Sequence, residues 1–140
     1  MLRHQNEQEI VIERPLKEVA NAFHGAGNHV GTVKDDRRSM GTMVIRTVTK
    51  AFPPQNASTV RIAFEALGEK KTKVRLHSDC FDGTVGFGSA GQAIDELIAA
   101  ADSYLSGRQP AKSGKNQLRL VATVLAVVAV LSVIIVWIAI

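Results

Sequence analysis

The chain has 140 residues with 17 basic and 13 acidic side chains, a net charge of +4 and an apolar content of 46%. This length provides for one compact domain and excludes two enzymatic domains. All 13 acidic residues lie at or before Asp102, and 13 of the 17 basic residues lie at or before Arg75, so the last four basic residues supply the net charge. This distribution leaves the domain without a basic face of its own and argues against a nucleic-acid partner.

Residues 9–13, Glu-Ile-Val-Ile-Glu, predict a first short strand that stops at Arg14. Pro15 suits the first position of a helix. The next apolar residues recur at i, i+3, i+4 and i+7 and predict one helical face: Leu16, Val19, Ala20 and Phe23. Gly25 and Gly27 are expected to end this helix, because glycine often closes a helix in left-handed geometry.

Residues 29–34 and 42–49 predict a hairpin with a charged, exposed turn at residues 35–41. Residues 59–67 and 72–78 alternate apolar and polar side chains, as half-buried strands do. Sequential pairing of these strands in a meander is the simplest arrangement.

A long last helix is predicted from an N-cap at Ser89 to Gly107, about 18 residues in all. One face of it is apolar: Ile94, Leu97, Ile98, Ala101, Tyr104 and Leu105. The order of elements is therefore β-α-β-β-β-β-α. This order predicts an α+β fold in which an antiparallel sheet of about five strands carries both helices on one face.

The stretch GTVGFGSAGQA, residues 83–93, matches the G-x-G-x-x-G dinucleotide fingerprint at Gly86, Gly88 and Gly91. That fingerprint belongs to a parallel βαβ unit with an acidic residue about 20 positions later. Here the nearest acid in range, Asp102, lies within the following helix, and no strand comes after that helix. We therefore expect no cofactor, and we assign these glycines and Gly83 to a tight turn and a close start of the helix against the sheet.

The stretch EIVIERPLKEVANAF, a strand leading into a helix that begins at proline, resembles the opening of helix-grip domains of the START and polyketide-cyclase type. The long last helix over an antiparallel sheet is similar too, so the resemblance covers residues 8–106 by order of elements. It implies a ligand cavity between sheet and last helix, lined by Ile62, Phe64, Val74, Leu76, Ile94, Ile98 and Tyr104.

The chain departs from that family in having fewer strands and no second small helix. A TBP-like arrangement fits the strand count better. A smaller sheet under one long helix leaves open whether the interior is hollow or packed solid.

Residues 120–140, LVATVLAVVAVLSVIIVWIAI, carry no charge. Twenty-one residues at roughly 1.5 Å each reach about 31 Å, close to the roughly 30 Å of a bilayer core. They predict a single C-terminal transmembrane helix, and the arrangement resembles that of tail-anchored proteins. Small residues on one stripe would let this helix pack closely against a membrane protein or a second copy: Ala122, Ala126, Ala129 and Ser132.

Residues 107–119 form a basic linker whose side chains are expected to contact anionic lipid headgroups: Arg108, Lys112, Lys115 and Arg119. The positive-inside rule then places residues 1–106, as one domain, on the cytoplasmic side of the plasma or inner membrane. The first ten residues have no apolar signal-peptide core, and the single cysteine agrees with a reducing compartment.

Few side chains have the spacing of a catalytic or metal site. The cluster His77, Asp79, Cys80 and Asp82 lacks the paired spacing of zinc ligands, so no metal is expected. Cys80 has no evident neighbouring base and is expected in the core. No catalytic residue is predicted, and Cys80 and His77 are the only candidates if the chain is an enzyme.

Several cations are expected on the open face of the sheet: Arg61, Lys73, Arg75 and His77. Glu9, Glu13 and Glu65 are expected among them. Such a face is either an ordinary mixed-charge surface or a docking surface for an acidic patch of another protein.

Two functions follow from these patterns. The first is a non-enzymatic, tail-anchored membrane protein whose cytosolic α+β domain binds or scaffolds a protein partner, as an accessory subunit of a membrane complex. The alternative is a membrane-tethered helix-grip domain that binds a lipid or another small hydrophobic ligand.

Overall fold

The computed structural model describes residues 3–49, 56–81 and 90–108. The elements in chain order are β1 (Arg3–Ile12), α1 (Leu16–Val30), β2 (Gly31–Arg37), the short 3₁₀ helix η1 (Arg38–Met40), β3 (Thr42–Thr47), β4 (Ser58–Gly68), β5 (Lys71–Phe81) and α2 (Ala90–Leu105). The predicted α+β class and the order of strands and long helices are confirmed.

The five strands form one sheet in the order β1-β5-β4-β3-β2, and every neighbouring pair is antiparallel. The predicted meander is confirmed for β2 to β5, and β1 closes the sheet by pairing with β5 over ten consecutive residues. A dinucleotide fingerprint needs parallel strands, so this topology does not offer the context in which that motif works.

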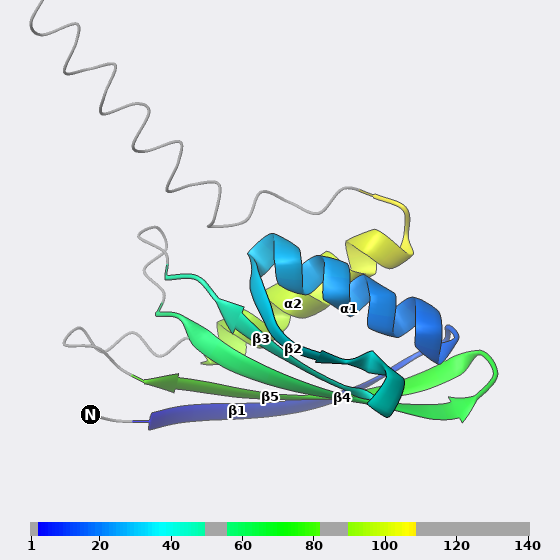
Figure 1. The fold of residues 1–140 in the computed structure, drawn as a ribbon, viewed down its shortest axis with the longest axis horizontal. Coiled ribbons are helices and arrows are strands. Elements are labelled where there is room, and N and C mark those ends of the chain that lie inside the picture. Colours follow the sequence, from blue (N-terminus) through cyan, green and yellow to red (C-terminus); the bar gives the residue numbers. More distant parts are fainter. Residues whose placement is uncertain (1–2, 50–55, 82–89, 109–140) are drawn as a thin grey trace, which may run out of the picture.

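Both helices lie over the same face of the sheet (Figure 1). Their apolar faces and the inward side chains of the strands form one buried core. Its largest fully buried members are Phe23, Met43, Ile45, Ile62, Leu76, Ile94 and Leu97. The rings of Phe23 on α1 and Phe64 on β4 meet edge to face at 5.7 Å, which fixes α1 on the sheet.

The prediction that Gly25 and Gly27 end the first helix is wrong, because α1 continues to Val30. Both glycines lie where the helix is approached closely. A Cβ at Gly27 would stand 2.6 Å from the Cδ1 atom of Ile45, and a Cβ at Gly25 would stand 3.1 Å from the ring of Tyr104. These glycines therefore allow α1 to pack tightly on β3 and on α2.

The first strand begins at Arg3 rather than at residue 9. The residues before Glu9 are polar and have weak strand propensity, but pairing with the long strand β5 extends β1 over them. The predicted exposed turn at residues 35–41 is also shorter than expected, because β2 reaches Arg37 and η1 occupies the corner.

Within the described residues, no helix is long and apolar enough to cross a membrane. The predicted transmembrane helix at 120–140 lies outside the described residues, as do Lys112, Lys115 and Arg119. Arg108 is described and exposed.

We expect Gly31→Ala to destabilise the fold strongly. Gly31 joins α1 directly to β2, and a Cβ there would stand 2.1 Å from the carbonyl oxygen of Arg46, a backbone atom that cannot easily move aside. Overpacking of this kind costs about 1–3 kcal/mol of unfolding free energy.

Urea denaturation of the full chain measures this cost. Gly68→Ala is the matched control, because a Cβ at Gly68 meets nothing within 4 Å and should change stability by less than about 1 kcal/mol. Equal stabilities of the two variants would contradict the close approach at Gly31.

Candidate functional site

The inward face of the sheet and the inner face of α2 enclose an apolar interior. In β4, inward Val60, Ile62 and Phe64 alternate with more exposed residues along the strand. Ile62 pairs with Leu76 of β5, and Phe64 pairs with Val74. This alternation positions two strands of apolar side chains opposite α2.

Five of the seven residues predicted to line a ligand cavity belong to this buried core: Ile62, Phe64, Val74, Leu76 and Ile94. Ile98 is partly buried and packs against the same core. Tyr104 lies elsewhere, with its ring against Gly25 of α1 and 43% of its surface exposed. It lines a surface groove of about 340 Å³ between the two helices, together with Glu18 and Asn21.

One end of the interior is polar. Thr47, Ser58 and Ser78 are buried there. The Ser58 backbone N–H donates to Thr47 Oγ1 at 2.8 Å, and Thr47 Oγ1 donates to the Ser58 carbonyl at 3.3 Å. In the part of the chain that the structure describes, the side-chain hydroxyls of Ser58 and Ser78 are buried without a hydrogen-bond partner. Neither serine is among the site residues that the sequence predicts.

The two residues considered for an enzyme do not meet. Cys80 is fully buried, and its thiol donates to the carbonyl oxygen of Ala57 at 3.8 Å. His77 is half-exposed and shares the other face of β5 with Asp79. Because residues of odd and even number point to opposite faces of a strand, this histidine cannot act as the base for that thiol.

His77 and Asp79 do share a face, as predicted, with His77 Nε2 at 3.6 Å from Asp79 Oδ1. Asp82, the fourth member of the predicted metal-capable cluster, lies outside the described residues. Among those described, no three histidine, cysteine, aspartate or glutamate side chains are grouped to hold a metal ion.

The open face of the sheet carries a network of ion pairs. The cations predicted there alternate along β4 and β5, and three of them pair with acids: Arg61 with Asp79, Lys73 with Glu65 at 2.8 Å, and Arg75 with Glu9 at 2.8 Å. Glu13, also expected there, follows the end of β1 and lies outside the strand. Most of the face is therefore locally neutralised.

Asp79 is the central acid of this network. Its side chain is only 6% exposed although it lies on the open face. Gln5 of β1 donates to its Oδ1 at 2.8 Å, and Arg61 of β4 donates to its Oδ2. Three strands are thus tied together by one carboxylate.

The pKa values at the neighbouring pairs shift in the direction that the pairing requires. The hydrogen bond from Lys73 lowers the pKa of Glu65 from its ordinary value of 4.5. The hydrogen bond to Glu9 raises the pKa of Arg75 above its ordinary value. Glu65 and Arg75 therefore remain charged at neutral pH.

A shallow groove of about 260 Å³ crosses this open face. Two cross-strand rows line it: Thr42, Ala63 and Arg75, then Val44, Arg61 and His77. Ala63 is the smallest side chain of the six, so the hollow lies over it. Among the described residues, the groove has cationic neighbours and no acidic lining residue.

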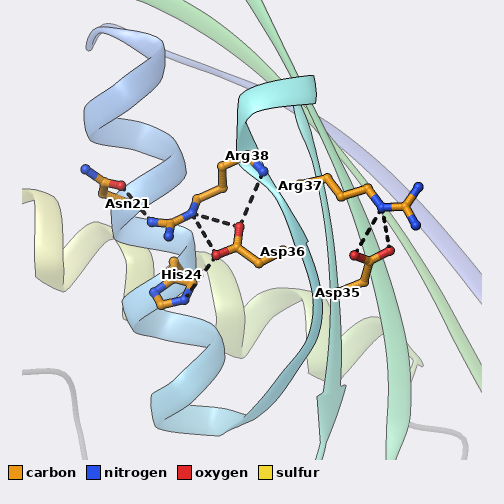
Figure 2. A network of polar contacts seen from close by, with 6 residues as sticks. All are labelled: Asn21, His24, Asp35, Asp36, Arg37 and Arg38. Carbon is orange, nitrogen blue, oxygen red and sulfur yellow. Dashed lines mark hydrogen bonds and ion pairs between the residues drawn. The ribbon is translucent and has the colours of Figure 1, made fainter.

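A second polar network ties α1 to the corner between β2 and β3 (Figure 2). Arg38 Nε donates to Asp36 Oδ1 at 2.8 Å, and Arg38 Nη1 donates to Asn21 Oδ1 at 2.8 Å. His24 Nε2 lies 3.5 Å from Asp36 Oδ2. The bond from Arg38 lowers the pKa of Asp36 below its ordinary value of 3.8. This network orders the corner on the helix side of the molecule.

The glycine-rich stretch is described only from its last residues. Gly91, in the first turn of α2, is approached by Asn6 of β1, whose Nδ2 would lie 2.6 Å from an added Cβ. This contact supports the expected close start of the helix against the sheet. Gly83, Gly86 and Gly88 lie outside the described residues.

No protein-family model and no curated protein matches this sequence. In structure, the chain is similar to the di-domain ARO/CYC BexL from the BE-7585A biosynthetic pathway, with a TM-score of 0.50 and 15% identity over 74% of this chain and 46% of that chain. It is also similar to the di-domain ARO/CYC StfQ from the steffimycin biosynthetic pathway, with a TM-score of 0.49 and 14% identity over 71% of this chain and 44% of that chain.

A START superfamily protein from Mycobacterium smegmatis is similar with a TM-score of 0.47 and 12% identity, over 74% of this chain and 98% of that chain. The chain spans less than half the length of the two di-domain proteins. At these identities the likeness concerns the fold alone. The chain has a helix-grip type of fold, as the resemblance of its first strand and helix predicted.

Proposed function

We propose that this chain is a non-enzymatic, membrane-tethered helix-grip domain that binds a small hydrophobic ligand between α2 and the sheet. The observation that carries the proposal is the interior itself, in which apolar side chains of β4, β5 and α2 face one another. Sites for such ligands are lined mostly by apolar side chains with a few polar groups, as this interior is.

The inner residues are almost fully buried, so a ligand enters only if α2 moves away from the sheet. Ile98 and Leu105 lie at the border of the core and are only partly buried, so we expect α2 to separate first on their side. The membrane tether, residues 120–140 with the basic linker before it, would hold this domain beside a source of hydrophobic molecules on the cytoplasmic side.

Ala93→Phe tests whether a ligand occupies the interior. Ala93 is completely buried on the inner face of α2, so a phenyl ring there takes up ligand space. We expect the full-length variant to fold but to lose the ligand that organic extraction and mass spectrometry detect in the natural chain. In an interior packed solid, the same ring instead costs about 1–3 kcal/mol of stability.

Ala99→Phe is the matched control, because Ala99 is exposed on the same helix. This variant should keep both ligand and stability. Absence of any co-purified hydrophobic molecule from the natural chain, together with a destabilised Ala93→Phe variant, would overturn the proposal.

A protein partner is the second candidate, and the groove on the open face favours it. Arg61 and Arg75 contribute Nη1 and Nε, respectively, to their ion pairs. A guanidinium has five N–H groups, so each retains donors for a further carboxylate. Beside the apolar surface of Val44 and Ala63, these donors suit an acidic segment with one apolar side chain.

This partner would be reached by a chain anchored in the membrane, as an accessory subunit next to a larger membrane protein or a second copy. The small-residue stripe of the predicted membrane helix would supply a further contact: Ala122, Ala126, Ala129 and Ser132. The basic linker would rest on anionic headgroups.

Ala63→Glu tests the groove without removing any ion pair. It fills the hollow with a negative charge between Arg61 and Arg75. We expect it to weaken binding of the fluorescent peptide Glu-Asp-Phe-Glu-Asp to the full chain in phosphatidylcholine nanodiscs by about tenfold. Fluorescence anisotropy measures this binding.

Leu67→Glu adds the same charge to the same strand at an exposed position outside the groove lining and should leave binding unchanged. Equal effects of the two substitutions, or equal binding of a lysine-rich peptide, would remove the groove as a partner site.

A further inference from the structure

The two unpartnered serine hydroxyls lie next to each other inside the domain. Ser58 pairs with Cys80 across the strands, and Val60 pairs with Ser78, so the serines are diagonal neighbours on the inward face of β4 and β5. Both are completely buried. Burial of an unpaired hydroxyl is unfavourable, so an adjacent pair calls for a physical reason.

The two serines lie at a polar end of the interior, next to an apolar stretch of β4 and β5. Asn6 of β1 lies opposite Ser78, and the same asparagine touches the first turn of α2 at Gly91. Moving away from that end along β4 and β5, the next inward pairs are Ile62 with Leu76 and Phe64 with Val74. An occupant of this interior would meet hydroxyls at this end and hydrocarbon along these two pairs. Thr72 is buried beyond them, and its hydroxyl donates to the carbonyl oxygen of Arg14.

The charges around this end favour a neutral polar group. Asp79, the nearest buried charge in β5, turns to the open face and is bound there by Gln5 and Arg61. His4, opposite Cys80, is the titratable side chain on the inward side of β1 at this end. In the described part of the chain, no arginine or lysine is among the buried residues, so a carboxylate or phosphate would be desolvated here without a described cation to balance it.

We propose that Ser58 and Ser78 hydrogen-bond the neutral polar group, a hydroxyl or carbonyl, of an otherwise apolar ligand whose hydrocarbon part lies along Ile62 and Leu76. This inference rests on the proposed ligand-binding function and gives the ligand its chemical class and orientation. A hydroxyl both donates and accepts, so the serine pair can satisfy either group.

Two probes of equal chain length separate the polar contribution from the apolar one. Native mass spectrometry of the full chain measures occupancy by dodecanol and by dodecane, for the natural chain and for Ser58→Ala, Ser78→Ala and the double variant. We expect the double variant to lose about tenfold in dodecanol affinity, because hydrogen bonds are lost, and to keep its dodecane affinity.

The same substitutions make an opposite prediction for the chain without a probe. Once the co-purified ligand has been extracted, alanine removes an unpaired buried hydroxyl, so the thermal unfolding midpoint of the ligand-free chain should stay equal or rise. Ser103→Ala is the matched control, since the Ser103 hydroxyl already donates to the carbonyl oxygen of Ala99 at 3.0 Å. That variant should leave both probe affinities unchanged.

The experiment distinguishes failure of the proposed ligand binding from failure of the role assigned to the two serines. If the natural chain binds neither probe, ligand binding in the interior is wrong. If it binds both and the serine substitutions reduce both equally or neither, ligand binding stands and the assignment of the hydroxyls is wrong. A lower unfolding midpoint in both single variants would also overturn it, because the hydroxyls would then be paired already.

Discussion

The pairing of β1 with β5 is the constraint on which the rest of the structure depends. Ten consecutive antiparallel pairs join the beginning of the chain to its last strand. The same register places Gln5 on Asp79 and Glu9 on Arg75 on the open face. On the inward face it brings Asn6 against the start of α2. Without this pairing the sheet would lose its edge strand β1. The buried carboxylate of Asp79 would lose its hydrogen bond from Gln5, and the first turn of α2 would lose its contact with Asn6.

The sheet separates two kinds of chemistry. Its inward face is apolar over its middle, with Ser58 and Ser78 buried at the end near the start of α2 and Thr72 buried at the other end. Its open face carries a network of ion pairs, and the shallow groove over Ala63 interrupts this network. The proposed ligand binding and partner binding would therefore use different faces, and neither proposal excludes the other. The proposed membrane tether would serve both, since it would concentrate the domain where hydrophobic molecules and membrane proteins are found.

The sequence predicts a strand or helix well where its apolar residues recur at the spacing of one buried face. Alternation in residues 59–67 and the helical period around Ile94 locate β4 and α2, because one face of each is buried. It does not predict the polar first half of β1, which depends on a partner strand distant in the chain. The prediction that the first helix ends at Gly25 is wrong because close helix packing and helix termination both favour glycine. Ser58 and Ser78 did leave a signal, as polar residues in the inward phase of their strands. Asp79 left none, since an outward acid is ordinarily exposed.

The proposal that matters most is that the interior between α2 and the sheet holds a small hydrophobic molecule. Isotope-filtered nuclear Overhauser spectroscopy tests it on the full chain, purified from the cells that make it with ¹³C only in the methyl groups of isoleucine and leucine. We expect contacts between protons of an unlabelled ligand and the methyl groups of Ile62, Leu76 and Ile94. Methyl groups that contact only one another, with no ligand protons near them, would contradict it.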